Sequence, residues 1–436
     1  MPLIRGTVIQ FADGTTGIVR SKIGEGGQGE VYQIEYQDKP RALKWYKGRP
    51  SSVFVDNLKR NVSRRIPASS FLWPKAISDS ALGIGYVMDL VDSNLKDFSK
   101  FLANIHHFSS EDAVINAAIN LCVAFQKLHL QGLAYFDLND GNFFFNPDSG
   151  ELQIGDNDNV SSADFNVSNI QGKRGYMAPE IVLDGNPNRY SDYYSLAIIL
   201  FRLIFVDHPL HGKNMEKFPC MTPKVITYLY GTNPIFIFDP TNSDNEASQE
   251  FSPNALNRWG GVPSFVREAF IKAFSRNNQL NPQERMMESE WIKIFQRWRS
   301  CLNQCPSCGN VTYIEPKDKG VCKECGESYP IFWMQSNFKE YIPLVAGQKL
   351  YESQIGLDGH FVVVAEVVKT QNNDKILGIR NLSLIDWSVN YGTQQRIITK
   401  GQAFRLCDNM TIRFSNIKEM KIRLVNPQQV RDLVKI

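Results

Sequence analysis

Apolar and polar residues alternate along the first ninety positions, which predicts a region made mostly of β-strands. The alternating segments are 18–23, 31–36, 41–46 and 84–90, and glycine, aspartate and proline separate them. A period of two residues is typical of a strand with one buried face. Between the third and fourth segments, the polar residues 52–65 predict a single helix.

The pattern becomes helical from about residue 93 to residue 299. Apolar residues recur every three or four positions in 112–130 and in 191–205, as expected for helices with one buried face. Residues 207–255 are rich in proline, asparagine, aspartate and serine, so we expect a loop-dominated insert there. A β-rich small lobe followed by a helical large lobe would leave a cleft between the two.

Alternation returns in residues 340–436 and predicts an all-β sandwich or barrel for this tail. Its alternating segments lie between glycine and asparagine turns, at 361–368, 376–385, 410–414 and 420–425. The domains expected from these changes of pattern are a small lobe, a large lobe, a cysteine-paired ribbon and the β tail. Their expected bounds are 1–91, 92–299, 300–332 and 336–436.

The composition is that of an ordinary globular protein, with 43% apolar and 21% charged residues among 436. The net charge of +3 gives no reason to expect a nucleic acid or an anionic membrane as partner. No apolar run approaches the roughly 20 residues that span a bilayer. The N-terminus lacks the apolar stretch of a signal peptide, so a cytoplasmic location is expected.

A glycine-rich loop near the N-terminus is followed by a lysine at strand spacing. Glycines let the backbone approach phosphate groups without a Cβ in the way. Lys44 follows Val31 at the right distance for the next antiparallel strand, where it would point at the phosphates. Considered alone, the glycines also fit a plain hairpin turn, and the lysine fits a solvated strand position. The glycines are Gly24, Gly26, Gly27 and Gly29.

Three residues of the second lobe complete a phosphoryl-transfer set. Asp137, Asn142 and Asp156 offer carboxylate and amide oxygens, which can ligate magnesium and orient an attacking hydroxyl group. Along the chain the parts come in the order glycine loop, lysine, Asp-x4-Asn and aspartate. The ordered set is more specific than the loop alone, and it predicts ATP and Mg²⁺ as cofactors.

The segment Tyr-Phe-Asp-Leu-Asn-Asp-Gly-Asn around Asp137 resembles the catalytic loop of eukaryotic-type protein kinases, His-Arg-Asp-Leu-x-x-x-Asn. The resemblance covers about residues 15–299 and implies an α+β bilobal kinase fold. It also implies that Asp137 is the catalytic base or the residue that orients the substrate hydroxyl. By the same resemblance Asn142 and Asp156 ligate magnesium, with Asp158 as a weaker competitor for Asp156.

The resemblance further implies an adenine pocket between the lobes. Phe144 would form its floor opposite two small apolar residues of the first lobe. A methionine would guard its back, and the backbone of a hinge segment would hydrogen-bond the base. The expected lining residues are Val31, Ala42, Met88, Asp89, Val91 and Phe144.

Three downstream motifs favour a protein kinase over the small-molecule kinases that share the loop. Ala-Pro-Glu, ending at Glu180, resembles the motif that closes the activation segment of the family. Asp192 resembles the aspartate that braces the catalytic-loop backbone, and Arg285 resembles the arginine that pairs with the glutamate. These residues belong to a protein-substrate platform, which argues against a small-molecule phosphotransferase.

Several positions depart from the family pattern. Tyr135 and Phe136 replace His-Arg, so we expect no switch that works by neutralising this arginine with a phosphate group. Asn139 stands where the family has a lysine that helps to hold the γ-phosphate. Asn157 stands in place of the phenylalanine of Asp-Phe-Gly, which removes an aromatic ring from the interior.

Two charged residues are candidates for compensating roles. The family pairs its phosphate lysine with a glutamate of the small-lobe helix, and the only carboxylate available there is Asp56. Asp56 would therefore have to serve as the partner of Lys44. Lys173 lies where serine/threonine kinases keep a threonine beside the catalytic aspartate. We hypothesise that it supplies the charge missing at Asn139; the plainer alternative is an exposed basic pair.

Four cysteines follow the pattern C-x2-C-x13-C-x2-C, which indicates a zinc site. Each C-x-x-C turn can present two thiolates to a tetrahedral zinc ion. With four thiolates and no open coordination position, the predicted role is structural, in a ribbon too small to build its own core. Cys122 falls on the apolar face of its helix and is expected in the core. The predicted ligands are Cys305, Cys308, Cys322 and Cys325.

The tail resembles a forkhead-associated domain, a β-sandwich that reads phosphothreonine. The phosphate-binding set of that family is not recognisable here, so a protein-binding version is expected, with Arg380 and Asn381 as the residues to test. The order of kinase, ribbon and tail resembles bacterial kinases of a tellurium-resistance-associated triad. In that triad the kinase accompanies a metal-dependent protein phosphatase and a von Willebrand A domain protein.

The resemblance implies a serine/threonine kinase of stress or defence signalling that phosphorylates itself or those two partners. The alternative is a pseudokinase that holds a nucleotide and scaffolds a complex. Asn139, Asn157 and the missing helix glutamate favour the scaffold, whereas Lys44 and Asp137 oppose it.

Overall fold

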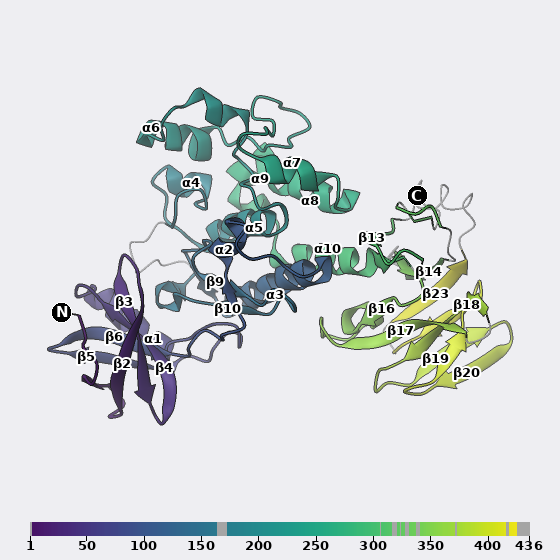
Figure 1. The fold of residues 1–436 in the computed structure, drawn as a ribbon, viewed down its shortest axis with the longest axis horizontal. Helices are drawn as coiled ribbons and strands as arrows, with labels where there is room; N and C mark the ends of the chain where they lie inside the picture. Colours follow the sequence, from purple (N-terminus) through teal and green to yellow (C-terminus); the bar gives the residue numbers. More distant parts are fainter. Residues whose placement is uncertain are drawn as a thin grey trace. The chain divides into compact units, whose positions relative to one another are not determined.

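The computed structural model describes the greater part of the chain, and it divides into two compact units, Met1–Ile292 (unit 1) and Lys293–Ile436 (unit 2) (Figure 1). The finer division of each unit into two domains stays a prediction. The described residues are 2–163, 172–305, 307–315, 321–322, 324–327, 331–336, 341–370, 373–415 and 418–424.

Unit 1 begins with a six-stranded antiparallel sheet in the order β1-β2-β3-β4-β6-β5. All four strands predicted from alternation are present in it. The inward side chains of one face, among them Val19, Ile34 and Leu43, form an apolar cluster. The strands are β1 (Val8–Gln10), β2 (Thr16–Glu25), β3 (Gly29–Tyr36), β4 (Lys39–Tyr46), β5 (Ala76–Ser80) and β6 (Gly83–Met88).

The predicted small-lobe helix is α1 (Ser52–Ser63), and the side chain of Ser51 caps it by accepting a hydrogen bond from the backbone of Phe54. Such a cap satisfies one of the unpaired N–H groups of the first turn. The apolar face of α1 buries Phe54, Val55 and Leu58 against residues of β4, β5 and β6. The helix is thereby fixed to one face of the sheet.

The rest of unit 1 is mainly helical, as predicted. Its two long helices, α3 (Glu111–Leu130) and α5 (Arg189–Phe205), are largely buried and pack against each other. The shorter helices are α2 (Phe98–Leu102), α4 (Pro179–Val182), α6 (Pro223–Ile226), α7 (Pro253–Trp259), α8 (Ser264–Ala273) and α9 (Arg276–Leu280). A last helix, α10 (Glu288–Cys301), continues into unit 2.

Within the described part of the chain, α3 alone is long and apolar enough to cross a membrane, and 61% of its apolar window is buried inside the protein. Such burial is typical of a core helix, so no membrane span is indicated. Cys122 lies on this helix and is fully buried, as expected. Residues 207–255 contain only short helical turns besides the start of α7, which confirms the loop-dominated insert.

Short strands carry the functional loops of the large lobe. The hairpin of β9 (Phe143–Phe145) and β10 (Leu152–Ile154) lies directly between Asn142 and Asp156 in the chain, and β7 (Lys96–Asp97) pairs with β9. A second pair joins β8 (Leu133–Ala134) to β11 (Ser161–Ser162). The 3-10 turn η1 (Asn157–Asn159) connects β10 to β11.

Unit 2 contains a β-sandwich, which confirms the predicted β class of the tail. One sheet has the order β15-β14-β23-β22-β19-β20 and the other β16-β17-β18-β21. One apolar cluster, with Trp387 and Ile379 at its centre, takes residues from both sheets. The strands are β14 (Phe332–Ser336), β15 (Tyr341–Leu344), β16 (Lys349–Tyr351), β17 (Val363–Thr370), β18 (Asn373–Asn381), β19 (Trp387–Tyr391), β20 (Gln394–Ile398), β21 (Ala403–Arg405), β22 (Thr411–Arg413) and β23 (Glu419–Leu424).

Candidate phosphoryl-transfer site

The glycine-rich loop is the turn between β2 and β3, closed by a hydrogen bond from the backbone N–H of Gly26 to the carbonyl of Gly29 at 2.8 Å. A Cβ at Gly29 would lie 2.5 Å from the carbonyl oxygen of Trp45 on β4, so this position must be glycine for the sheet to pack. A Cβ at Gly26 or Gly27 would meet nothing within 4 Å. Packing therefore explains why Gly29 is a glycine, but it does not explain Gly26 and Gly27 at the tip of the loop.

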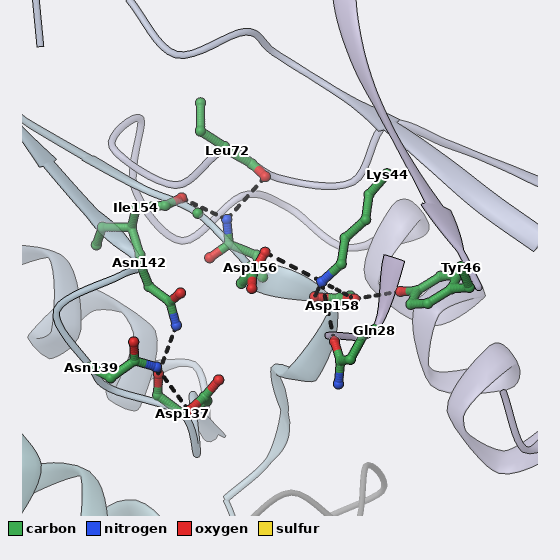
Figure 2. Close-up of polar contacts among 12 residues, drawn as sticks. Gln28, Lys44, Tyr46, Leu72, Asp137, Asn139, Asn142, Ile154, Asp156 and Asp158 are labelled. Atoms are coloured by element: carbon green, nitrogen blue, oxygen red, sulfur yellow. Dashed lines mark hydrogen bonds and ion pairs between the residues drawn. The ribbon is translucent and has the colours of Figure 1, made fainter. Parts of the chain in front are cut away.

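Lys44 lies on β4 with only 5% of its surface exposed. Its Nζ is 2.9 Å from a carboxylate oxygen of Asp158, 3.3 Å from Asp156 and 3.3 Å from the amide oxygen of Gln28 in the glycine loop (Figure 2). Burial lowers the pKa of Lys44, but the two aspartates outweigh it and raise the pKa to about 12. The lysine is therefore charged.

The structure corrects the expected partner of Lys44. Asp56 lies on the outer side of α1, with 67% of its side chain exposed and its nearest cation, Lys59, 4.0 Å away. The inner side of the helix instead presents Asn57 and Asn61, which both donate to the carbonyl oxygen of Val160, at 2.8 and 2.7 Å. Side chains one position apart diverge by about 100° around a helix, so Asp56 points away when Asn57 points inward.

Asp158 is fully buried and accepts hydrogen bonds from both Lys44 and the hydroxyl of Tyr46. Lys44 and Tyr46 are two positions apart on β4 and thus project from the same face of the strand. Asp158, which the sequence offered as an alternative magnesium ligand, is thus the closest anionic partner of Lys44.

Asp137 is held in the loop between β8 and β9 by amide groups of the same loop. Asn139 Nδ2 donates to its Oδ1 at 2.9 Å, and Asn142 Nδ2 donates to its backbone carbonyl at 2.8 Å (Figure 2). Burial raises the pKa of Asp137 to about 6, with a further increase from the charge of Asp156 and a decrease from the hydrogen bond of Asn139. A carboxyl group with this pKa is ionised at neutral pH and can accept a proton near it.

The backbone of the Asp137 loop is fixed by Asp192 of α5. Its two carboxylate oxygens accept the N–H groups of Tyr135 and Phe136 at 2.7 and 3.0 Å, which confirms the bracing predicted for Asp192. The hydroxyl of Tyr135 donates to the carbonyl of Gly155, next to Asp156. The aromatic replacement thus ties the Asp137 loop to the Asp156 segment.

The segment after β10 turns sharply at Asp156, whose φ of 47° lies in the left-handed region. Asn157 follows, fully buried, and its Nδ2 donates to the carbonyls of Leu72 and Ile154 at 2.9 and 2.8 Å. Asn157, which stands where the family has a phenylalanine, therefore links the backbone at Leu72 to the end of β10 by hydrogen bonds.

The predicted pairing of Arg285 with Glu180 is confirmed. Two guanidinium nitrogens bind the two carboxylate oxygens at 2.8 and 2.6 Å, and Arg285 also donates to the carbonyls of Tyr190 and Gln279. The ion pair joins the start of α4 to the segment before α10, and the bond to Tyr190 adds a contact with α5. It fastens the Ala-Pro-Glu segment to the helical core.

Residues 75–286 match the family model described as the protein kinase domain. This match supports a eukaryotic-type protein kinase domain in this part of the chain. The chain is 23% identical over 198 residues to Protein kinase C-like 2 of Schizosaccharomyces pombe, covering 44% of this chain and 18% of that protein.

It is also similar to the serine/threonine-protein kinases pakE of Dictyostelium discoideum (22% over 236 residues, 50% of this chain and 24% of the relative) and Nek1 of Mus musculus (25% over 169 residues, 37% and 13%). The chain thus spans less than a quarter of the length of these relatives.

Four expected adenine-pocket residues of the kinase domain share one apolar cluster. Ala42 and Met88 are buried in it, and Val31 and Val91 pack against it. Asp89 is an ion-pair partner of Arg41 and, at 3.0 Å, of Lys75, which gives its carboxylate a structural contact. Phe144 lies half-buried on β9, in the loop region of Asn142.

Lys173 reaches the Asp137 loop but contacts a different residue from the one hypothesised. Its ammonium group forms an ion pair with Asp140, which also lies 3.9 Å from Arg202. About half of the Lys173 side chain is exposed. The amide of Asn139 itself, rather than a lysine, contacts Asp137.

The four predicted zinc ligands of unit 2 lie together, with all four Sγ atoms within 4.8 Å of one another. Two cross-pairs are 3.7 Å apart. Zinc–sulfur bonds of about 2.3 Å in a tetrahedron separate the sulfur atoms by about 3.8 Å, so the spacing fits zinc. The cross-pairs are Cys305 with Cys325 and Cys308 with Cys322.

The two cysteine turns have the same backbone construction. The N–H of Gly309 donates to the carbonyl of Cys305 and that of Gly326 to Cys322, at 2.9 and 3.0 Å, with φ of 73° and 74° at the glycines. The first turn closes the hairpin of β12 (Leu302–Gln304) and β13 (Val311–Tyr313). A backbone hydrogen bond from Cys308 lowers the pKa of Cys305, whereas burial and hydrogen bonds with neighbouring thiols raise the pKa of Cys308 and of Cys325.

The two residues of the tail selected for testing have structural contacts. Asn381 is fully buried, and its Nδ2 donates to the carbonyls of Ile385 and Ile398 at 2.8 and 3.0 Å. Arg380 lies 3.7 Å from Glu366 on the neighbouring strand. Asn381 therefore stabilises a turn of the sandwich, and a binding role for Arg380 and Asn381 stays a prediction.

Sequence reasoning missed the contacts that Gln28, Tyr46, Asn57 and Asn61 make around Lys44 and Val160. A signal existed for the two asparagines, because they are four positions apart and share a face with the apolar residues of α1. Tyr46 gave a weaker signal, since a tyrosine two positions after a strand lysine is an ordinary core residue.

Proposed function

We propose that the kinase domain is a serine/threonine protein kinase, which transfers the γ-phosphoryl group of ATP to a hydroxyl group of a protein substrate, including its own chain. The observation that carries the proposal is the grouping of Lys44, Asp137, Asn142 and Asp156 around one site, from elements up to 112 positions apart. Phosphoryl transfer depends mainly on positioning and charge stabilisation, and these residues supply both.

The donor atoms fit a magnesium ion. Asn142 uses its amide nitrogen on Asp137, which leaves the amide oxygen as the ligand atom. Asp156 uses one carboxylate oxygen on Lys44, and its side chain is 43% exposed. Oxygen ligands of these two kinds are those that Mg²⁺ prefers. Bound there, the ion would neutralise phosphate charge as the transfer proceeds.

In the proposed reaction, the glycine loop covers the phosphates and Lys44 binds the α- and β-phosphate oxygens. Asp137 accepts a hydrogen bond from the substrate hydroxyl and receives its proton. The hydroxyl oxygen forms the new bond to the γ-phosphorus while the bond to the β–γ bridging oxygen breaks, releasing ADP. Asn139 holds Asp137 in the orientation that this step needs.

The test is transfer of labelled γ-phosphate by the purified chain, with Mg²⁺, to itself and to a generic protein substrate. We expect transfer by the wild type and none by Asp137→Ala, with ATP binding retained by the variant. Binding without transfer by the wild type would favour the nucleotide-holding scaffold instead. Phosphoserine or phosphothreonine in the product, identified by mass spectrometry, tests the residue specificity.

For unit 2 we propose a structural zinc ion on Cys305, Cys308, Cys322 and Cys325. The sulfur spacing and the two matching turns support it. A hairpin as short as β12–β13 cannot bury enough apolar surface to fold alone, so the ion would supply the missing stabilisation. The sandwich after it is proposed to be a forkhead-associated-like domain that recruits a protein partner.

The domain order supports a more specific proposal, that the chain acts in the cytoplasm of a bacterium in stress or defence signalling. Its proposed partners are a metal-dependent protein phosphatase and a von Willebrand A domain protein. The test is transfer of phosphate from the purified kinase to the purified von Willebrand A protein, and its removal by the phosphatase. Transfer to a generic substrate but to neither partner would contradict this part of the proposal alone.

A further inference from the structure

The carboxylate that holds Lys44 comes from the segment following the proposed magnesium ligand. Asp158 is two positions after Asp156, and its oxygens lie 2.9 and 3.1 Å from Lys44 Nζ. Asp156 itself is farther, at 3.3 Å, and much more exposed. If Asp156 turns to a metal ion, Asp158 remains as the partner of the lysine.

Asp158 is held from several sides, so its position is well defined. The hydroxyl of Tyr46 donates to it from β4, and its side chain has no exposed surface. Its neighbour Asn157 is latched to the carbonyls of Leu72 and Ile154. A buried carboxylate is stable as an anion only when its oxygens are paired and hydrogen-bonded, and Lys44 and Tyr46 meet this need.

Helix α1 contacts the same segment through two asparagines, and its carboxylate, Asp56, is not paired with Lys44. Asn57 and Asn61 bind the carbonyl of Val160, two positions after Asp158. Residues 156–160 thus contain the proposed magnesium ligand Asp156, the lysine partner Asp158 and Val160, whose carbonyl binds α1. In the kinase family the lysine partner is a glutamate of the helix, and here the helix offers amides instead.

We propose that Asp158 is the positioning residue of Lys44 and takes the place of the helix glutamate. The inference rests on the proposed kinase function and concerns how its lysine is placed. Its consequence is that movement of α1 does not separate Lys44 from its carboxylate, because both partners lie outside the helix. The placement of Lys44 is coupled instead to the 156–160 segment.

The experiment compares Asp158→Asn with Asp56→Asn, the variant of the exposed helix aspartate. Loss of a buried charged hydrogen bond is expected to lower kcat/KM for ATP about 100-fold in Asp158→Asn. Asp56→Asn should change it less than about twofold, as for an exposed charge. The reverse ranking would overturn the inference, and so would an unchanged Asp158→Asn enzyme.

A double-variant cycle separates positioning from a general structural role. If Asp158 acts through Lys44, then Asp158→Asn should have no further effect on the residual single-turnover rate of Lys44→Met. Additive losses would show that it acts elsewhere. An Asp158→Asn enzyme that is restored by raised Mg²⁺ would identify a metal ligand, which also contradicts the inference.

Tyr46→Phe serves if Asp158→Asn does not fold. It removes the hydroxyl that holds Asp158 and keeps the ring, so a decrease of several-fold in kcat/KM is expected, the scale of one hydrogen bond. No decrease would contradict the inference. If the wild type shows no transfer, the proposed function is wrong. The pairing of Lys44 with Asp158 can then still be tested by a double-mutant cycle on the unfolding free energy of the unliganded protein.

Discussion

Asp192 of α5 accepts the backbone N–H of Tyr135 at 2.7 Å, which joins two positions 57 residues apart. The second oxygen of the same carboxylate accepts the N–H of Phe136, whose φ of 67° is unusual for an aromatic residue. The buried carboxylate thus stabilises a strained turn immediately before Asp137. Positioning of the proposed catalytic aspartate therefore depends on a buried residue of α5 that binds the backbone just before it.

The first prediction concerns Asp192→Ala. Removing the carboxylate leaves two buried N–H groups without their acceptor and leaves His129 with Glu288 alone, so the free energy of unfolding should fall by about 3–5 kcal/mol. Phosphate transfer should fall at least 10-fold, because the Asp137 turn loosens. Chemical denaturation and a transfer assay below the melting temperature measure the two effects. Asp244→Ala, on an exposed turn with an ordinary negative φ, is the control and should change neither.

A second prediction concerns the pH dependence of stability. Burial lowers the pKa of His129, but its hydrogen bonds to Asp192 and Glu288 outweigh this and raise the pKa to about 9. A raised pKa stabilises the folded state fully below the unfolded value of about 6.5, and the contribution, about 3 kcal/mol, is lost as pH rises through 9.

Unfolding free energies of the wild type and of His129→Gln, measured from pH 6 to pH 9.5, check this. The difference between the two proteins should shrink with rising pH over that window. A constant difference would mean that His129 is neutral in the folded protein.

The third prediction concerns the ion pair of Arg285 and Glu180. Only 3% of the Arg285 side chain is exposed, and removing one partner of a buried pair typically costs about 3–5 kcal/mol. Arg285→Ala should therefore lower the melting temperature strongly, while Arg276→Ala on the exposed start of α9 should not. Arg285→Lys should recover only part of the loss, because an ammonium group cannot bind both oxygens of Glu180 in the same planar geometry.

The fourth prediction concerns Lys173, whose contact in the structure differs from the one hypothesised from the sequence. Its ion pair with Asp140 is half exposed, and exposed pairs typically contribute about 0.2–1 kcal/mol. We therefore expect Lys173→Ala to lower transfer less than about fivefold, whereas Lys44→Ala leaves only a residual rate. A loss of more than 50-fold in Lys173→Ala would restore the hypothesis that Lys173 replaces the missing lysine at position 139.

The last prediction concerns metal removal. The full-length protein should contain about one zinc ion per chain by elemental analysis. A strong chelator, or Cys308→Ser, should remove it and lower the melting transition of unit 2. Cys220→Ser, which changes an exposed cysteine of unit 1, should retain the metal. Full-length protein purified without zinc, and equally stable with and without chelator, would contradict the site.

Local patterns carried much of the prediction. Periodicity identified β2, β3, β4, β6 and the long helices α3 and α5, because burial of one face imposes its period on the sequence. The helix α1 was predicted from a polar segment. The resemblance to the kinase family also implied the pairing of Glu180 with Arg285 and the bracing role of Asp192. The spacing of two C-x-x-C turns predicted the gathering of four cysteines, since each turn fixes two of them locally.

What the sequence could not predict are choices between residues of similar chemistry. Asp56 and Asp158 are both aspartates near expected elements, and the sequence favoured the one on the helix. The structure selects Asp158, because the inward face of α1 is occupied by Asn57 and Asn61. Likewise, Lys173 was expected near the Asp137 loop, but only the fold shows that its ion-pair partner is Asp140.

The sequence by itself determined the strand-rich first part and the helical second part of unit 1, the order of the proposed site residues and the cysteine set, since these follow from short-range spacing and periodicity. Only the tertiary structure decided which carboxylate holds Lys44. The two residues are 114 positions apart, and their contact depends on how β4 and the turn after β10 approach each other. Burial then makes that contact specific, because a charge without a partner there would be too costly.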